Sequence, residues 1–190
     1  MELAAILASL CELDPPEATI QTEASGNHGA IARLIALGAL VHTGKRQSIV
    51  CWVCDTPHML AVEHAGDGRY HCFCPDTGYH EVPAETLDVY SVDMQWIGHS
   101  IRSCLGRQAG SASPPAPLST LVDIGRFRFG SYNCRLFFAR RLADRAQFEC
   151  TMEIVSRLAG TGPAIVVCTT LQHLIPGVWP NRIASVDRAP

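Results

Sequence analysis

The sequence predicts an α+β fold made of two units, and three observations carry that prediction. Segments with apolar residues at helical spacing are mixed with short runs in which apolar and polar residues alternate, as in strands. A stretch rich in Gly, Ser and Pro, residues 106–119, follows neither pattern and has the composition of a linker. The charge also changes sign there: residues 1–106 carry five Lys/Arg and thirteen Asp/Glu, whereas residues 107–190 carry ten and five. We therefore expect units over 1–105 and 120–190.

The composition is that of a soluble globular protein. Hydrophobic residues make up 47% of the 190-residue chain and charged residues 17%. No apolar run approaches the ~18 residues of a membrane span, and Glu2 stands where a signal peptide would be basic, so we expect a cytoplasmic protein. The nine cysteines are an odd number spread along the chain, which favours reduced thiols over a disulfide framework.

Three helices and a hairpin are expected before the first cysteine pair. A helix over 2–12 is ended by Pro15 and Pro16, and a short second helix is expected over 16–23. A third helix starts at Ser25-Gly26-Asn27 and ends at Gly38. The residues after it, 39–50, predict a strand, a turn at Gly44-Lys45 and a second strand.

This order resembles the winged helix, the helix-turn-helix variant common in bacterial regulators. The segment HGAIARLIALGALVHTG carries the likeness. The resemblance implies binding of DNA or of a protein, with Asn27, His28 and Arg33 on the third helix as the DNA-facing candidates. The acidic charge of this unit opposes contact with phosphates, so a protein-binding winged helix is an equal alternative.

The rest of the first unit is expected to be a small sheet closed by a helix. MLAVEHA and RYHCFC flank Gly66-Asp67-Gly68, a strong hairpin signal, and YHEV adds a third strand. A helix over 93–105 closes the unit, with its apolar face formed by Met94, Ile97, Ile101 and Cys104.

Two cysteine pairs in this region have a spacing typical of a metal site. Cys51 and Cys54 form C-x2-C, and Cys72 and Cys74 form C-x-C after seventeen residues, one residue short of the usual second pair. Because residues i and i+2 of a strand point to one face, Cys72 and Cys74 can face the same ion.

The stretch 49–82 therefore resembles a zinc ribbon, which implies Zn²⁺ as the cofactor. The implied ligands are Cys51, Cys54, Cys72 and Cys74. The short second pair leaves the fourth ligand open, with His58 and His80 as substitutes. The alternative is a β-rich core that contains small buried cysteines and no metal.

A zinc ion held by four thiolates has no open coordination position and is structural. The sequence also lacks H-E-x-x-H, the deaminase motif, the P-loop and the G-x-S-x-G elbow. We therefore assign no catalytic residue.

The second unit is expected to have the order β-β-α-β. In LVDIGRFRFGSYNCRLFFARRL a two-residue turn at Gly130-Ser131 joins two strands, a helix follows over 143–158, and PAIVVCTT reads as a buried strand. The segment around Trp179-Pro180 and RIASV is a candidate for a further strand.

That turn places three arginines on one face of the hairpin. Arg126 pairs with Arg135, and Arg128 lies beside them on the same face. Like charges opposite each other destabilise a sheet, so we expect an anion across them, from nucleic acid, an acidic partner or the acidic first unit. The alternative is an ordinary solvated face.

The function expected from these features is a non-enzymatic, zinc-stabilised regulatory or adaptor role, binding a protein partner or nucleic acid. The alternative is a metal-dependent hydrolase or a nucleic-acid-processing enzyme with an unrecognised site. A restriction-type nuclease suits the β-β-α-β order, but the acidic cluster with lysine that it needs is missing from the second unit. A structural subunit of a larger complex is a third hypothesis.

Overall fold

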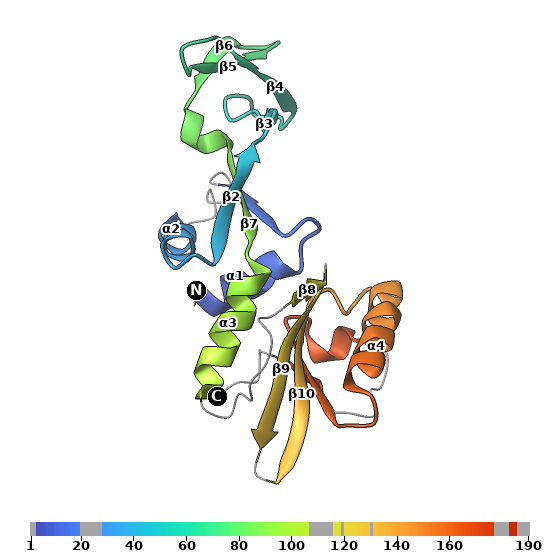
Figure 1. The fold of residues 1–190 in the computed structure, drawn as a ribbon. Coiled ribbons are helices and arrows are strands. Elements are labelled where there is room, and N and C mark those ends of the chain that lie inside the picture. Colours follow the sequence, from blue (N-terminus) through green and yellow to red (C-terminus); the bar gives the residue numbers. More distant parts are fainter. Residues whose placement is uncertain are drawn as a thin grey trace. The chain divides into compact units, whose positions relative to one another are not determined.

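The structure is a computed structural model that describes residues 3–19, 28–106, 116–118, 120–129, 131–176 and 183–185. Helices and three β-sheets are both present, so the chain is of mixed α and β class, as expected. The chain divides into two compact units (Figure 1). We call Glu17–Val92 the inserted unit, and Met1–Pro16 with Asp93–Pro190 the flanking unit.

The inserted unit contains a three-stranded antiparallel sheet with one helix. Its strand order is β1 (Glu17–Thr19), β7 (Asp88–Val92), β2 (Leu40–Lys45). Helix α2 (His28–Ala36) buries Ile31 and Leu34. Gly38 ends it with a φ of 76°, a left-handed conformation that glycine adopts without steric cost, and its N–H bonds the carbonyl of Ile35.

A four-stranded antiparallel sheet forms the other half of the inserted unit. Its strands follow chain order: β3 (Ser48–Val50), β4 (Met59–His64), β5 (Tyr70–Cys74) and β6 (Gly78–Val82). The expected β4–β5 hairpin is confirmed, with positive φ at Gly66, Asp67 and Gly68 in its turn. A 3-10 helix, η2 (Ala84–Leu87), leads from β6 into β7. The core of this sheet consists of Ile49, Cys51, Leu60, Cys72, Cys74, Val82 and Leu87.

Two elements of the inserted unit differ from expectation. Residues 17–19 of the expected second helix form β1, because they pair with Val89–Ser91 of β7, and tertiary pairing outweighs local preference. The expected hairpin over 39–50 is wrong because β2 pairs with β7 while β3 pairs with β4. Strand β7 was not expected from the sequence. Residues 20–27, including the expected helix start, lie outside the described part of the chain. The winged-helix resemblance remains a prediction.

The flanking unit is built on a five-stranded mixed sheet. Its strand order is β12 (Ile183–Ser185), β11 (Ala164–Cys168), β10 (Tyr132–Ala139), β9 (Leu121–Phe129), β8 (Ala116–Leu118). Strands β8, β9 and β10 are antiparallel neighbours, whereas β10, β11 and β12 run parallel. Helix α4 (Arg145–Ala159) joins β10 to β11, so the β-β-α-β order is confirmed, and β12 falls in RIASV.

Helices cover both faces of this sheet (Figure 1). Helix α3 (Met94–Leu105) packs on β9, and α4 packs on β10 through a core that includes Phe137, Val155 and Val166. Asp93 caps α3 by accepting from the N–H groups of Gln95 and Trp96 at 2.8 and 3.1 Å. Cys104 is exposed, contrary to the expected inward position.

Helix α1 (Leu3–Cys11) also belongs to the flanking unit. The buried Arg140, which follows β10, donates to the carbonyls of Cys11 and Leu13 at 3.1 and 2.7 Å and fixes the end of this helix. The division between the units therefore differs from the boundary expected at 106–119, because α1 and α3 pack with the C-terminal sheet. Residues 107–115 and 119 of the expected linker lie outside the described residues.

None of the helices in the described ranges is long and apolar enough to cross a membrane.

An ion pair anchors β7 to β2 in the inserted unit and makes its stability depend on pH. Lys45 Nζ lies 2.5 Å from Asp88 Oδ1, and His42 Nε2 lies 3.2 Å from the same atom. The hydrogen bond from Lys45 is the main reason that the pKa of Asp88 is below its ordinary value of 3.8.

We predict that Asp88→Asn lowers the free energy of unfolding at neutral pH by about 0.5–1 kcal/mol. Because the folded pKa is depressed, this contribution is present above pH 3.8 and is lost as the pH falls through the folded pKa. Urea unfolding of wild type and variant across this range checks the prediction. Glu85→Gln, at an exposed neighbour, is the control, and a constant difference at all pH values would contradict the prediction.

Candidate metal site and arginine face

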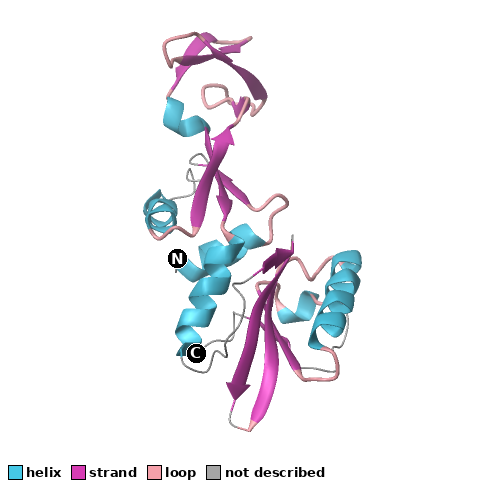
Figure 2. Cartoon of the chain, viewed as in Figure 1, coloured by secondary structure: helices cyan, strands magenta, loops and turns pink. Residues whose placement is uncertain are grey.

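A loop between β3 and β4 provides the first half of the candidate metal site. It runs from Cys51 to His58 and is closed by a hydrogen bond from the N–H of Cys51 to the carbonyl of His58, at 2.8 Å. Figure 2 draws this loop in pink beneath strands β4 to β6. Cys51 is buried, and Cys54 and His58 are half-buried.

Cys74, the last residue of β5, provides the second half. The chain turns directly after it and returns as β6, so that Cys74 is paired with Gly78. The hydroxyl of Thr77 and the backbone N–H groups of Asp76 and Thr77 donate to the Cys74 sulfur. The bond from Thr77 is the largest cause that lowers the pKa of Cys74 to about 6, followed by the bond with Cys54 and then the two backbone bonds. The hydrogen bonds from the turn and from Cys54 thus favour a negative charge on this sulfur.

The two halves bring three thiols and one imidazole together. The ligand atoms of Cys51, Cys54, His58 and Cys74 all lie within 4.8 Å of one another. The Cys74 Sγ lies 3.9 Å from Cys51 Sγ, 3.2 Å from Cys54 Sγ and 3.6 Å from His58 Nε2.

These separations fit tetrahedral coordination. With Zn–S bonds of about 2.3 Å and Zn–N bonds of about 2.0–2.1 Å, tetrahedral angles place two sulfurs about 3.8 Å apart and a sulfur and a nitrogen about 3.6 Å apart. The Cys74–Cys51 and Cys74–His58 distances agree with these values, and the Cys74–Cys54 distance is shorter. Two of these three separations therefore match a tetrahedral zinc site, and the other pairs of ligand atoms lie within 4.8 Å.

The imidazole of His58 is oriented for this role. Its Nδ1 lies 3.0 Å from the carbonyl oxygen of Thr56, which can only accept a hydrogen bond, so Nδ1 carries the proton. That leaves the Nε2 lone pair facing the sulfurs. The same bond is the main cause of the raised pKa of His58. A histidine that binds a metal through one nitrogen usually donates from the other to a carbonyl or carboxylate.

The structure gathers a different fourth residue from the one expected at Cys72. Cys72 and Cys74 do share the buried face of β5, as the i, i+2 spacing predicts. However, i and i+2 are about 7 Å apart along a strand, while sulfurs on one zinc ion are about 3.8 Å apart. Cys72 lies one step further into the core, opposite Val62 and His80, and is not among the four gathered residues.

A C-x2-C pair that began at Cys74 would need a cysteine at position 77, where the sequence has Thr77. The pair is therefore incomplete, and this was the signal that the fourth ligand has to come from another segment. His80 does not join the group either; its Nε2 bonds the Thr77 hydroxyl at 2.7 Å, and its ring lies edge-on to Trp52. His58 is one of the two substitutes expected from the sequence. The hydrogen bond that closes the β3–β4 loop places it near Cys74.

The group also brings negative charge close together, which a cation would stabilise. The pKa of Cys54 is raised to about 12, chiefly by its hydrogen bond with Cys74, and the Asp76 carboxylate lies 3.5 Å from its sulfur. A divalent ion at the centre would replace the shared proton and stabilise all the thiolates together.

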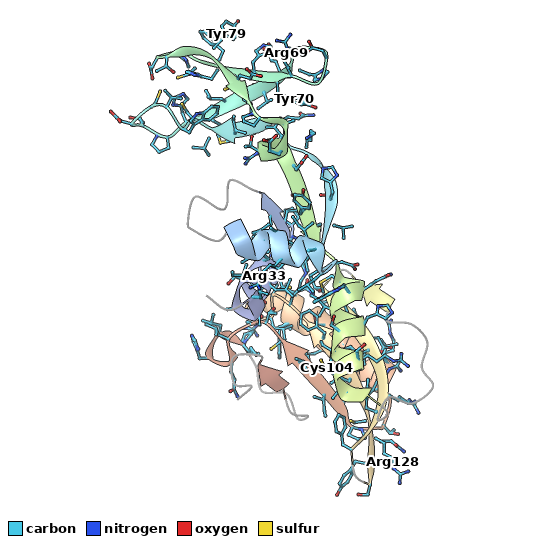
Figure 3. All side chains as sticks on the ribbon, turned by 90° about the vertical axis from the view of Figure 1, so that its left-hand side faces the viewer. Arg33, Arg69, Tyr70, Tyr79, Cys104 and Arg128 are labelled. Carbon is cyan, nitrogen blue, oxygen red and sulfur yellow. The ribbon has the colours of Figure 1, made fainter. Side chains whose placement is uncertain are left out.

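The arginine hairpin of the flanking unit has the register expected from the sequence. Phe129 pairs with Tyr132, and Arg126 pairs with Arg135. Arg126 and Arg128 are exposed, and Figure 3 shows Arg128 near the end of this hairpin.

Arg135 is engaged inside the protein. It donates to both carboxylate oxygens of Asp123 and to the carbonyl of Leu158 at the end of α4. The side chains of Asp123 and Arg135 are only 17% and 25% exposed. Arg135 therefore has a partner within the flanking unit, and the binding of an external anion by the arginine face stays a prediction.

A cavity that was not expected from the sequence lies beside Glu12 in the flanking unit. It has a volume of about 450 Å³, between α1 and the residues that follow β11. The Glu12 carboxylate accepts from the hydroxyls of Thr169 and Thr170 and from the N–H of Arg141. These bonds assign Glu12 a role in joining α1 to the ends of β10 and β11.

Comparison with known proteins gives no family: no family model, no curated protein and no solved structure matches this chain. The functional argument therefore depends on the chain's own side chains.

We predict that Arg135→Gln lowers the free energy of unfolding by about 1–3 kcal/mol, because the half-buried Asp123 carboxylate loses its charged partner and keeps only the N–H of Gly125, and the Leu158 carbonyl loses the bond from Arg135. Arg126→Gln, at the exposed residue directly opposite, is the matched control and should change stability by less than about 0.5 kcal/mol. Urea unfolding measures both. Equal effects of the two variants would contradict a structural role for Arg135.

Proposed function

We propose that this protein is a non-enzymatic adaptor with a regulatory role, in which a structural zinc ion holds the inserted unit in shape for a protein partner. The observation that carries the proposal is the group formed by Cys51, Cys54, His58 and Cys74.

The donor set favours zinc over other common metals. Three sulfurs and one imidazole nitrogen suit a tetrahedral, borderline-soft ion, whereas Mg²⁺ and Ca²⁺ require oxygen ligands. Copper and iron also bind such ligands, so the identity of the metal has to be measured.

A structural role follows from the number and position of the ligands. Four protein ligands complete a tetrahedron and leave no position for a substrate or a reactive water. The ligands come from the β3–β4 loop and from the last residue of β5, so the metal would tie the loop directly to the far end of the β4–β5 hairpin. In zinc-finger peptides such binding contributes about 10–16 kcal/mol of apparent folding free energy.

A protein partner is better supported than nucleic acid. The inserted unit carries four Lys/Arg and nine Asp/Glu, a balance of −5. Zinc bound to three thiolates and a neutral histidine adds one further negative charge, which increases the repulsion of phosphates. No observation in the described ranges favours an enzyme; Asp123, the carboxylate in β9, is held by Arg135.

Zinc binding should depend on the four gathered residues. We expect one tightly bound zinc ion per chain, with an X-ray absorption spectrum that fits three sulfurs and one nitrogen. Cys74→Ala and His58→Ala should each weaken zinc binding at least about tenfold in competition with a chelator, because each removes a ligand.

Matched controls are present in the same strands. Cys72→Ala removes the neighbouring buried thiol, and His80→Ala removes the neighbouring imidazole; both should leave zinc affinity unchanged within about twofold. Loss of zinc from Cys72→Ala to the same extent as from Cys74→Ala would restore the four-cysteine site expected from the sequence. Absence of stoichiometric metal after preparation in zinc would end the proposal.

The second prediction concerns the structural role. Removal of zinc by a chelator should abolish hydrogen-exchange protection in β3 to β6, because the sheet loses the tie between its loops. Strands β9 to β11, in the flanking unit, should keep their protection and serve as the internal control. Unchanged protection in β3 to β6 after zinc removal would contradict a structural metal.

A further inference from the structure

The sheet that carries the metal site has a second, outer face with an unusual composition. Side chains alternate between the faces of a strand, so the residues between the buried ones of β4, β5 and β6 point away from the metal group. On this outer face lie Met59, Phe73 and Tyr79, and Val50 of β3 continues it opposite Met59.

These apolar side chains are strongly exposed. Met59 is 61% exposed, Phe73 53% and Tyr79 72%, and Figure 3 shows Tyr79 projecting outward from the sheet. Phe73 and Tyr79 are a direct cross-strand pair with ring centroids 5.0 Å apart, and the ring of His71 lies 5.7 Å from that of Tyr79. We call Val50, Met59, Phe73 and Tyr79 the outer apolar patch.

Such a patch is not what a solvated sheet face carries. The outer face of an antiparallel sheet is normally polar, and contiguous exposed apolar groups on soluble proteins mark interaction sites. The aromatic pair is also already organised by the strand register, so a partner that covers it loses little side-chain freedom.

The rim of the patch is acidic. Glu63 and Glu81 lie on either side of His71, in the strands next to it. The one arginine close by, Arg69, is held by Asp67 through two hydrogen bonds of 3.1 and 2.9 Å, so its charge is offset locally. Glu63 also lies 3.3 Å from Nε2 of His71, and Arg69 is within electrostatic range of Glu81. With Asp67, three carboxylates stand against one arginine, so the rim has a formal excess of two carboxylates around the apolar centre.

We propose that the outer apolar patch binds a protein segment in which an aromatic or aliphatic side chain is flanked by arginine or lysine. The apolar side chain would pack on Phe73 and Tyr79, and the basic groups would meet Glu63 and Glu81. This inference rests on the proposed adaptor function and names the surface and the chemistry of the partner. Charge complementarity selects this occupant, because a phosphate backbone would be repelled by the same carboxylates.

The test begins with selection from a display library of random short peptides on the full-length, zinc-loaded protein. Peptides that also bind the Phe73→Thr/Tyr79→Thr variant are removed; threonine keeps the strand propensity while it removes the rings. The expected result is enrichment of peptides with basic residues around an aromatic or aliphatic residue. Failure to enrich any peptide, or enrichment of peptides without basic residues, would overturn the proposal.

A selected peptide is then synthesised with a fluorescent label, and its affinity is measured by anisotropy. The double variant and Tyr79→Thr alone should each bind at least about tenfold more weakly, as expected for loss of a central aromatic contact. Glu63→Gln/Glu81→Gln should also weaken binding and reduce its dependence on salt. Val41→Thr, an exposed apolar residue in the other sheet of the same unit, is the matched control and should bind like wild type.

Three further outcomes would overturn the proposal. The first is equal peptide binding by Tyr79→Thr and wild type. The others are concentration-dependent self-association that the double variant abolishes, and binding of single-stranded oligonucleotides that depends on Tyr79. The zinc content of every variant is measured, so that failure of the patch can be told apart from failure of the proposed metal site. Loss of peptide binding with zinc retained tests the patch alone, whereas absence of zinc from the wild type contradicts the proposed function itself.

Discussion

The four-stranded sheet of the inserted unit is organised around one interaction, the approach of Cys51, Cys54 and His58 to the sulfur of Cys74. Hydrogen bonds from Thr77 and from Cys54 favour a negative charge on this sulfur. A thiolate with two thiols and an imidazole at these distances is a donor set that could hold a tetrahedral metal ion. The β3–β4 loop and the end of β5 meet at this point.

This interaction separates the two faces of the small sheet. The inner face is committed to the metal group and to a core of Ile49, Leu60 and Val82, so it has no surface left for a partner. The outer face has no such duty and carries the aromatic pair of Phe73 and Tyr79. The two faces of this sheet therefore differ: one is buried around the candidate metal site, and the other presents apolar side chains to solvent.

The flanking unit uses its charges differently. Arg135 is engaged by Asp123, Arg140 by the carbonyls at the end of α1, and Glu12 by the threonines after β11. Arg140 and Glu12 lie next to strand and helix ends, and Arg135 and Asp123 lie within β10 and β9. Each bond supplies a partner to a backbone atom or a buried side chain that would otherwise lack one. Part of the positive charge of residues 107–190 therefore holds this unit together.

The sequence by itself determined the features that depend on neighbouring residues. The register of the arginine hairpin, the turn at Gly66-Asp67-Gly68 and the β-β-α-β order followed from short-range turn chemistry and periodicity. Tertiary structure decided the pairing of strands that are distant in the sequence and which candidate ligands gather. Strand β7 took the place beside β2, and the closed β3–β4 loop brought His58 to Cys74 while the length of two strand residues kept Cys72 away. Strand spacing gives the face of a side chain, but its distance from a distant segment is set only when the chain folds.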